Sequence, residues 1–112
     1  MVIGEGKLIS ELTITRAPDA GGNTRLVIEG ELDSYTAPRL RTAVQEATAN
    51  DSGSLTLDVA DVSFVDSTGI SILVWAHKQV VRRGEALVLR SPTPDVYRVL
   101  EITGLTHVFR IE

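Results

Sequence analysis

The residues best suited to chemistry lie together in one short segment, Asp66-Ser67-Thr68-Gly69. A carboxylate, two hydroxyls and a glycine follow an apolar stretch and precede a helical pattern. At the start of a helix, a side-chain oxygen accepts a hydrogen bond from one of the free backbone N–H groups. Taken alone, these residues indicate an N-cap, which is the commonest role of Asp, Ser and Thr at such a position.

The same segment also suits a second chemistry, the phosphorylation of a hydroxyl. A phosphate at a helix N-terminus meets unpaired N–H groups and the positive end of the helix dipole, so the modified protein need not unfold. The group would add about −1.5 to −2 charges to the surface around it. Its position makes such a switch physically sensible, but the residues do not decide between a switch and a simple cap.

Other polar residues fit known sites less well. Asp51-Ser52-Gly53 resembles the D-[ST]-G motif of aspartic proteases, yet it follows a helical stretch and is typical of a turn. His77 and His107 lie in separate elements without ligand spacing around them, and the chain has no cysteine, so no metal site is predicted. No Gly-rich phosphate loop, nucleophile–base pair or acid–base pair occurs, so neither a cofactor nor enzymatic activity is expected.

The first half of the chain changes its apolar period once. Alternation from Leu8 to Thr15 and an extended run at 26–28 that stops at Gly30 predict two strands, joined by a turn at 18–23. Apolar residues then recur at a helical period from Leu40 to Ala47. Ser34 or Thr36 is expected to cap this helix, Pro38 suits its first turn, and turn residues at 50–53 end it.

The second half of the chain repeats the alternation of strands and helices. The expected elements are a strand at 55–59, a loop at 60–65, a helix from Asp66 to Arg83 stopped by Gly84, a strand at 86–89, a helix at 95–102 ended by Gly104, and a strand at 108–111. The order β-β-α-β-α-β-α-β predicts an α/β fold with a mixed, mostly parallel sheet and helices packed on one side. A chain of 112 residues fits one domain, 1–112.

Composition narrows the function classes. With 43% hydrophobic and 23% charged residues, the chain is ordinary for a protein that forms a core. A net charge of −4 and only 4% aromatic residues argue against direct binding of nucleic acid. No apolar run approaches the ~20 residues that cross a bilayer, and the start lacks the pattern of a signal peptide. A cytoplasmic protein without membrane insertion is therefore expected.

Two motifs carry a family resemblance. Gly30-Glu31-Leu32-Asp33, together with Phe64-Val65-Asp66-Ser67-Thr68-Gly69 downstream, resembles the STAS domains of bacterial anti-sigma factor antagonists. The resemblance extends to element order and spacing over most of the chain. It implies that the unphosphorylated protein binds an anti-sigma factor that is also an ATP-dependent serine kinase, and so frees a sigma factor. It also implies that this kinase phosphorylates the protein and that a serine phosphatase reverses the modification.

Carried over by position, the resemblance assigns roles to five residues. Ser67 is the expected phosphoacceptor, and Thr68 is the second choice. Asp66 would shape and charge the site, Gly69 would allow another backbone to approach closely, and Asp33 would lie near the same surface. These five residues form the expected partner-binding site.

The resemblance leaves some questions open. STAS-like domains also serve as scaffold subunits of stress-signalling or lipid-transport complexes, which is the alternative function. Members of the family often continue into a C-terminal helix, whereas this sequence ends at Ile111-Glu112. Trp75 is expected in the core or at a groove edge, and the protein is expected to be a monomer or a weak dimer.

Overall fold

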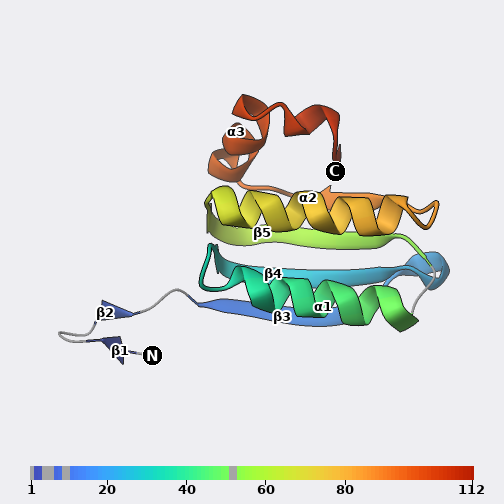
Figure 1. Cartoon of the computed structure of the whole chain (residues 1–112), viewed down its shortest axis with the longest axis horizontal. Coiled ribbons are helices and arrows are strands. Elements are labelled where there is room, and N and C mark those ends of the chain that lie inside the picture. Colours follow the sequence, from blue (N-terminus) through green and yellow to red (C-terminus); the bar gives the residue numbers. More distant parts are fainter. Residues whose placement is uncertain (1, 4–6, 9–10, 51–52) are drawn as a thin grey trace.

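The structure, a computed structural model, describes residues 2–3, 7–8, 11–50 and 53–112. One sheet of five strands carries the fold, in the spatial order β3-β4-β5-β6-β7 (Figure 1). Its strands are β3 (Leu12–Pro18), β4 (Thr24–Leu32), β5 (Leu55–Val65), β6 (Leu87–Arg90) and β7 (Arg110–Ile111). The helices are α1 (Ala37–Asn50), α2 (Ser67–Val81) and α3 (Pro94–Ile102), with 3-10 turns at Ala20–Gly22 and Leu105–His107. Two short strands, β1 (Val2–Ile3) and β2 (Lys7–Leu8), pair with each other.

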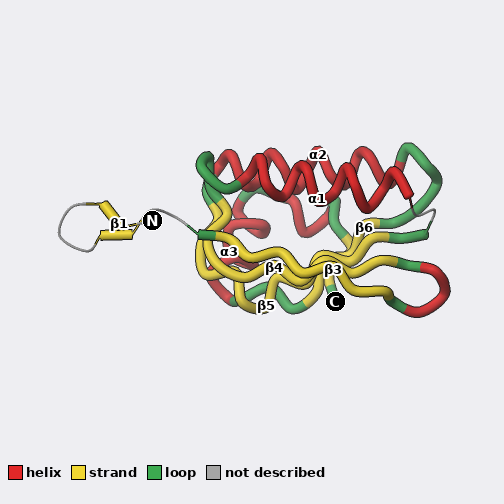
Figure 2. The backbone as a smooth tube through the Cα atoms, turned by 90° about the horizontal axis from the view of Figure 1, so that it is seen from below, coloured by secondary structure: helices red, strands yellow, loops and turns green. Residues whose placement is uncertain are grey.

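The sheet is mixed and mostly parallel, as the sequence predicts. Only β3 and β4 pair antiparallel, whereas β4–β5, β5–β6 and β6–β7 pair in parallel. Helices α1 and α2 cover the same face of the sheet (Figure 2). Helix α3 packs against β5, toward the edge of the sheet at which β4 and β5 end. The fold class is therefore confirmed.

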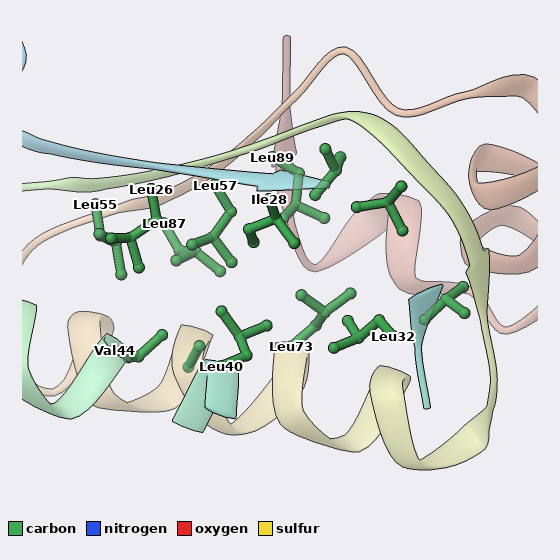
Figure 3. Close-up of a cluster of buried hydrophobic side chains, with 14 of the residues drawn as sticks. Leu26, Ile28, Leu32, Leu40, Val44, Leu55, Leu57, Leu73, Leu87 and Leu89 are labelled. Atoms are coloured by element: carbon green, nitrogen blue, oxygen red, sulfur yellow. The ribbon is translucent and has the colours of Figure 1, made fainter. Parts of the chain in front are cut away.

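The core lies between the sheet and the first two helices. Alternate residues of three parallel strands point toward α1 and α2, where Leu40, Val44 and Leu73 meet them (Figure 3). The strand residues in this layer are Leu26, Ile28, Leu55, Leu57, Leu87 and Leu89. Burial of apolar side chains at this density fixes the register of the strands, since a slip of one residue would turn the whole set toward solvent.

Strand β5 is longer than the sequence predicts, and the expected loop at 60–65 is wrong. Its pairing with β4 shifts register twice, between Val27 and Glu29 and between Gly30 and Glu31. Each irregularity inserts an extra residue into β5, so the buried positions Val59, Val62 and Val65 are three residues apart. The alternation by two is lost, and that is why the segment looks like a loop in sequence.

Several other boundaries move. Of the strand expected at 8–15, residues Ile9 and Ser10 lie outside the described residues, Leu8 belongs to β2, and β3 runs on to Pro18. The proline is tolerated because β3 is an edge strand. Strand β4 passes through Gly30, whose φ is +117° and where an added Cβ atom would collide with the backbone oxygen of Glu11. The end of α2 is close to the prediction, with Gly84 left-handed three residues after Val81.

Candidate functional site

The candidate site begins where β5 passes into α2. The last pair of the β4–β5 ladder joins Leu32 and Val65. One residue later, the N–H of Asp66 donates to the carbonyl oxygen of Leu32 at 3.1 Å. Because the ends of the two parallel strands are tied together, the residues that follow them, Asp33 and Asp66, start from adjacent points at one edge of the sheet. The N-termini of α1 and α2 lie side by side at this edge (Figures 1 and 2).

Asp66 is the N-cap of α2. It has extended backbone geometry, with φ −104° and ψ −172°, and its Oδ1 accepts a hydrogen bond from the N–H of Gly69 at 2.9 Å. Its carbonyl oxygen accepts the first helical bond, from the N–H of Ile70 at 2.9 Å. The cap that the sequence predicts is therefore confirmed, and the carboxylate at that position is already engaged with the helix.

Ser67, the first residue of α2, is exposed. Its backbone oxygen accepts a hydrogen bond from the hydroxyl of Ser71 at 3.0 Å, but the Ser67 hydroxyl itself bonds to nothing in the part of the chain that the structure describes. Thr68 beside it is half-buried. The residue with the most accessible hydroxyl in the motif is thus the one that the sequence ranks first.

Gly69 is buried where α2 crosses the end of β4. A Cβ atom added there would lie 2.5 Å from the carbonyl oxygen of Leu32 and 2.7 Å from Cγ2 of Val65. No side chain fits such a space without moving backbone. Gly69 therefore allows α2 to approach the end of β4 closely, and its expected part in partner binding stays a prediction.

Asp33 organises the neighbouring turn, between β4 and α1. Its Oδ1 accepts hydrogen bonds from the N–H groups of Tyr35 at 2.9 Å and Thr36 at 3.1 Å. The expectation that Ser34 or Thr36 caps α1 is wrong, because neither hydroxyl accepts a hydrogen bond from an α1 N–H group among the described residues. The two N–H groups that Asp33 binds lie just before the helix. The hydroxyl of Thr36 instead turns inward and donates to the carbonyl oxygen of Glu31 at 2.7 Å.

The edge that carries both turns is acidic and partly apolar. No lysine or arginine occurs in 30–38 or in 61–77, and Asp33, Asp61 and Asp66 lie in these segments. Two aromatic side chains are exposed beside them, Tyr35 by 62% and Phe64 by 48%. A phosphate on Ser67 would meet the N–H groups of α2 but no cation from these segments, so much of its charge would face outward.

His77 and Trp75, which are also singled out in sequence, pack against other side chains. The ring of His77 packs edge-to-face on Phe109, with centroids 5.6 Å apart. Trp75 is half-buried under the guanidinium of Arg41, which lies 4.5 Å from the ring centroid, at the α1–α2 seam. Within the described ranges, no three metal-ligating side chains cluster. Asp51 and Ser52 lie outside the described residues.

Among the helices that the structure describes, none is long and apolar enough to cross a membrane.

The sequence is similar to a known domain family and to named proteins. Residues 15–112 match the family model of the STAS domain. An anti-sigma-B factor antagonist of Listeria monocytogenes is 34% identical over 87 residues, which cover 78% of this chain and 76% of the relative.

Solved structures extend the comparison to the fold. An anti-sigma factor antagonist from Mycobacterium paratuberculosis superposes with a TM-score of 0.76 at 28% identity, over 90% of this chain and 85% of that one. The unphosphorylated form of the anti-sigma factor antagonist SpoIIAA superposes with a TM-score of 0.76 at 18% identity, over 89% of this chain and 88% of that one. The phosphorylated form of SpoIIAA, from Bacillus, superposes with a TM-score of 0.70 at 17% identity, over 89% of this chain and 91% of that one.

Proposed function

Since the chain belongs to the STAS domain family, we propose that it is an anti-sigma factor antagonist that works by partner switching. The unphosphorylated protein binds an anti-sigma factor that is also a serine kinase, and this binding frees a sigma factor. Phosphorylation of Ser67 by that kinase ends the complex, and a serine phosphatase restores it. The protein acts in the cytoplasm as one domain, 1–112, and as a monomer or weak dimer. It catalyses no reaction of its own.

The observation that carries this proposal is the exposed Ser67 hydroxyl at the first position of α2. A kinase needs an accessible hydroxyl, and Ser67 presents one on a rigid element. The carboxylate of Asp66 is held against the helix by the hydrogen bond that it accepts from the N–H of Gly69 at 2.9 Å. Thr68 is less accessible and remains the second choice.

The size of the charge effect is adequate for a switch. A hundredfold loss of affinity corresponds to about 2.7 kcal/mol, and like charges brought together across a close interface cost several kcal/mol. A phosphate on Ser67 joins Asp33 and Asp66 on an edge whose two segments, 30–38 and 61–77, contain no lysine or arginine. A partner that matches the unmodified edge is therefore repelled by the modified one, without any rearrangement of the fold.

The test combines phosphorylation and binding. Purified protein is incubated with a panel of anti-sigma factor kinases and ATP, and the phosphate is mapped by mass spectrometry. The expected site is Ser67, and the phosphorylated protein should bind the kinase about a hundredfold more weakly in isothermal titration calorimetry. Gln45→Glu is the matched control, because it adds a negative charge at an exposed position of α1 away from this edge.

Two results would overturn the proposal. One is phosphate only at residues remote from the 66–69 segment. The other is unchanged affinity after complete phosphorylation of Ser67, which would favour a scaffold subunit whose assembly does not depend on this hydroxyl.

A further inference from the structure

A hollow lies beside the candidate site, between the end of β5 and helix α3. Its volume is about 150 Å³, and its lining is Ser63, Phe64, Val65, Asp95, Val96 and Val99. A cavity of about this volume accommodates one benzene molecule, so the hollow matches a single medium-sized side chain. It is too small for a folded element and too open to be part of the core.

The lining of the hollow is mainly apolar. Phe64 is 48% exposed although it is an aromatic residue in the longest strand, and Val99 is only half-buried. Isolated exposed apolar residues are normal on a protein surface. An exposed aromatic ring that forms one wall of a concave site is more significant, because such pockets receive the anchor residues of protein interfaces.

The rim of the hollow carries a charge. Asp95 is exposed in the first turn of α3, and it makes no ion pair with any residue that the structure describes. None of the lining residues is basic. An occupant that presents an apolar side chain next to a lysine or arginine would therefore match both the wall and the rim.

The hollow is continuous with the candidate site along the chain. Val65 lines it, and the next two residues are the cap Asp66 and the exposed Ser67. A partner bound at Ser67 therefore lies two residues along the chain from Val65, one wall of the hollow.

We propose that this hollow is a second contact for the anti-sigma factor kinase, which inserts an aliphatic side chain against Phe64 and Val99 and places a lysine or arginine on Asp95. The inference rests on the proposed function and names the chemistry of the partner at that site. The phosphate acts at Ser67. The hollow contact strengthens both the stable complex with the kinase and the binding of the protein to the kinase as its substrate.

Substitutions in the hollow test this inference with the kinase that phosphorylates Ser67 in the assay above. Phe64→Ala removes the apolar wall and should weaken binding 10- to 100-fold. Asp95→Lys reverses the charge at the rim and should weaken it at least tenfold, more strongly at low salt. Ile102→Ala is the matched control, because Ile102 is 77% exposed on the same helix and does not line the hollow.

Kinetics give a second readout. Loss of a contact present in both the ground state and the transition state raises KM and leaves kcat unchanged. Phe64→Ala and Asp95→Lys should therefore be phosphorylated at Ser67 with the wild-type kcat and a raised KM. Circular dichroism and urea unfolding of each variant show whether it is folded, and the exposed Asp95 position keeps the test valid if Phe64→Ala is unstable.

The outcomes separate the two proposals. Wild-type binding and Ser67 phosphorylation, with both hollow variants within twofold of wild type, would overturn the hollow contact and leave the proposed function standing. Absence of binding to every kinase tested would overturn both. A change of oligomeric state in light scattering, with kinase affinity unchanged, would show that a second copy of the chain occupies the hollow and would also overturn the inference.

Discussion

Two turns at one edge of the sheet have similar sequences and different consequences. The first, Asp33–Thr36, leads from β4 to α1, and the second, Asp66–Gly69, leads from β5 to α2. In each, an aspartate follows a parallel strand and its Oδ1 accepts hydrogen bonds from backbone N–H groups. The donors are Tyr35 and Thr36, just before α1, in the first turn and Gly69, within α2, in the second. In each, a hydroxyl residue stands close to that aspartate.

The hydroxyls differ in where they lie. Thr36 is 1% exposed, and its hydroxyl donates to the carbonyl oxygen of Glu31 and accepts from the N–H of Asp33 at 3.0 Å. Ser67 is exposed, and its hydroxyl makes no bond in the described part of the chain. An aspartate with a nearby hydroxyl is thus a structural motif in one turn and a candidate switch in the other. The two turns differ in whether the hydroxyl residue is exposed to solvent, and the residue types in the turns do not predict this difference.

The packing between the two turns gives the largest expected effect. Gly69→Ala would place a Cβ 2.5 Å from the Leu32 carbonyl oxygen, so the start of α2 must move away from the end of β4. Overpacking of this kind costs about 1–3 kcal/mol. Because the obstructing atom belongs to the backbone, the loss in the free energy of unfolding should be about 3 kcal/mol. Urea unfolding should show this loss of stability. A loss below about 0.5 kcal/mol would mean that the two turns are not held together at Gly69.

Thr36→Val tests the buried hydroxyl and should have the second largest effect. Valine keeps the shape but removes the hydrogen bonds to the backbone of Glu31 and Asp33. Groups left unsatisfied in a buried place cost about 1–3 kcal/mol, so a decrease near 2 kcal/mol in the free energy of unfolding is expected. Thr42→Val is the control, because Thr42 is exposed and bonds only within α1. Equal losses of stability in Thr36→Val and Thr42→Val would show that the buried hydroxyl does not stabilise the first turn.

Replacement of either aspartate by alanine should reduce stability, and the two losses should differ by only about 1 kcal/mol. Asp33 accepts hydrogen bonds from at least two backbone N–H groups, and Asp66 accepts the capping bond from Gly69. Loss of an N-cap carboxylate costs about 0.5–2 kcal/mol, so Asp66→Ala should cost about 1 kcal/mol. A hydrogen bond contributes about 0.5–1.5 kcal/mol net, so Asp33→Ala should cost about 2 kcal/mol. Thermal unfolding of both variants at one pH gives the comparison. The reverse order would show that the second turn depends more on its carboxylate than the hydrogen bonds indicate.

The sequence predicts the second turn better than the first. Asp66 as cap and Ser67 as the first helical residue follow from residue type and position, because α2 has a strong apolar period behind them. In the first turn, the sequence predicts Ser34 or Thr36 as the cap, whereas the side chain that binds backbone N–H groups there is Asp33.

Phe64 shows a different limit of prediction. Two irregularities in the β4–β5 pairing remove the alternation around it, so its strand looks like a loop. The hollow that it lines needs α3, which the sequence predicts with the right apolar face but cannot place against β5. Local chemistry is therefore predictable here, whereas surfaces built from distant segments are not.

Ser67→Ala should have the smallest effect on stability and the most complete effect on regulation. The side chain is exposed and its hydroxyl has no partner among the described residues, so its loss should change the free energy of unfolding by less than about 0.5 kcal/mol. The variant should still bind the kinase, but with ATP present it should take up no phosphate and stay bound, whereas the wild type is released. Thr36→Val, which loses stability and keeps Ser67, should be phosphorylated and released normally wherever it is folded. Phosphate uptake by Ser67→Ala at the wild-type rate would move the switch to Thr68 or beyond, and the exposed hydroxyl would no longer distinguish the second turn from the first.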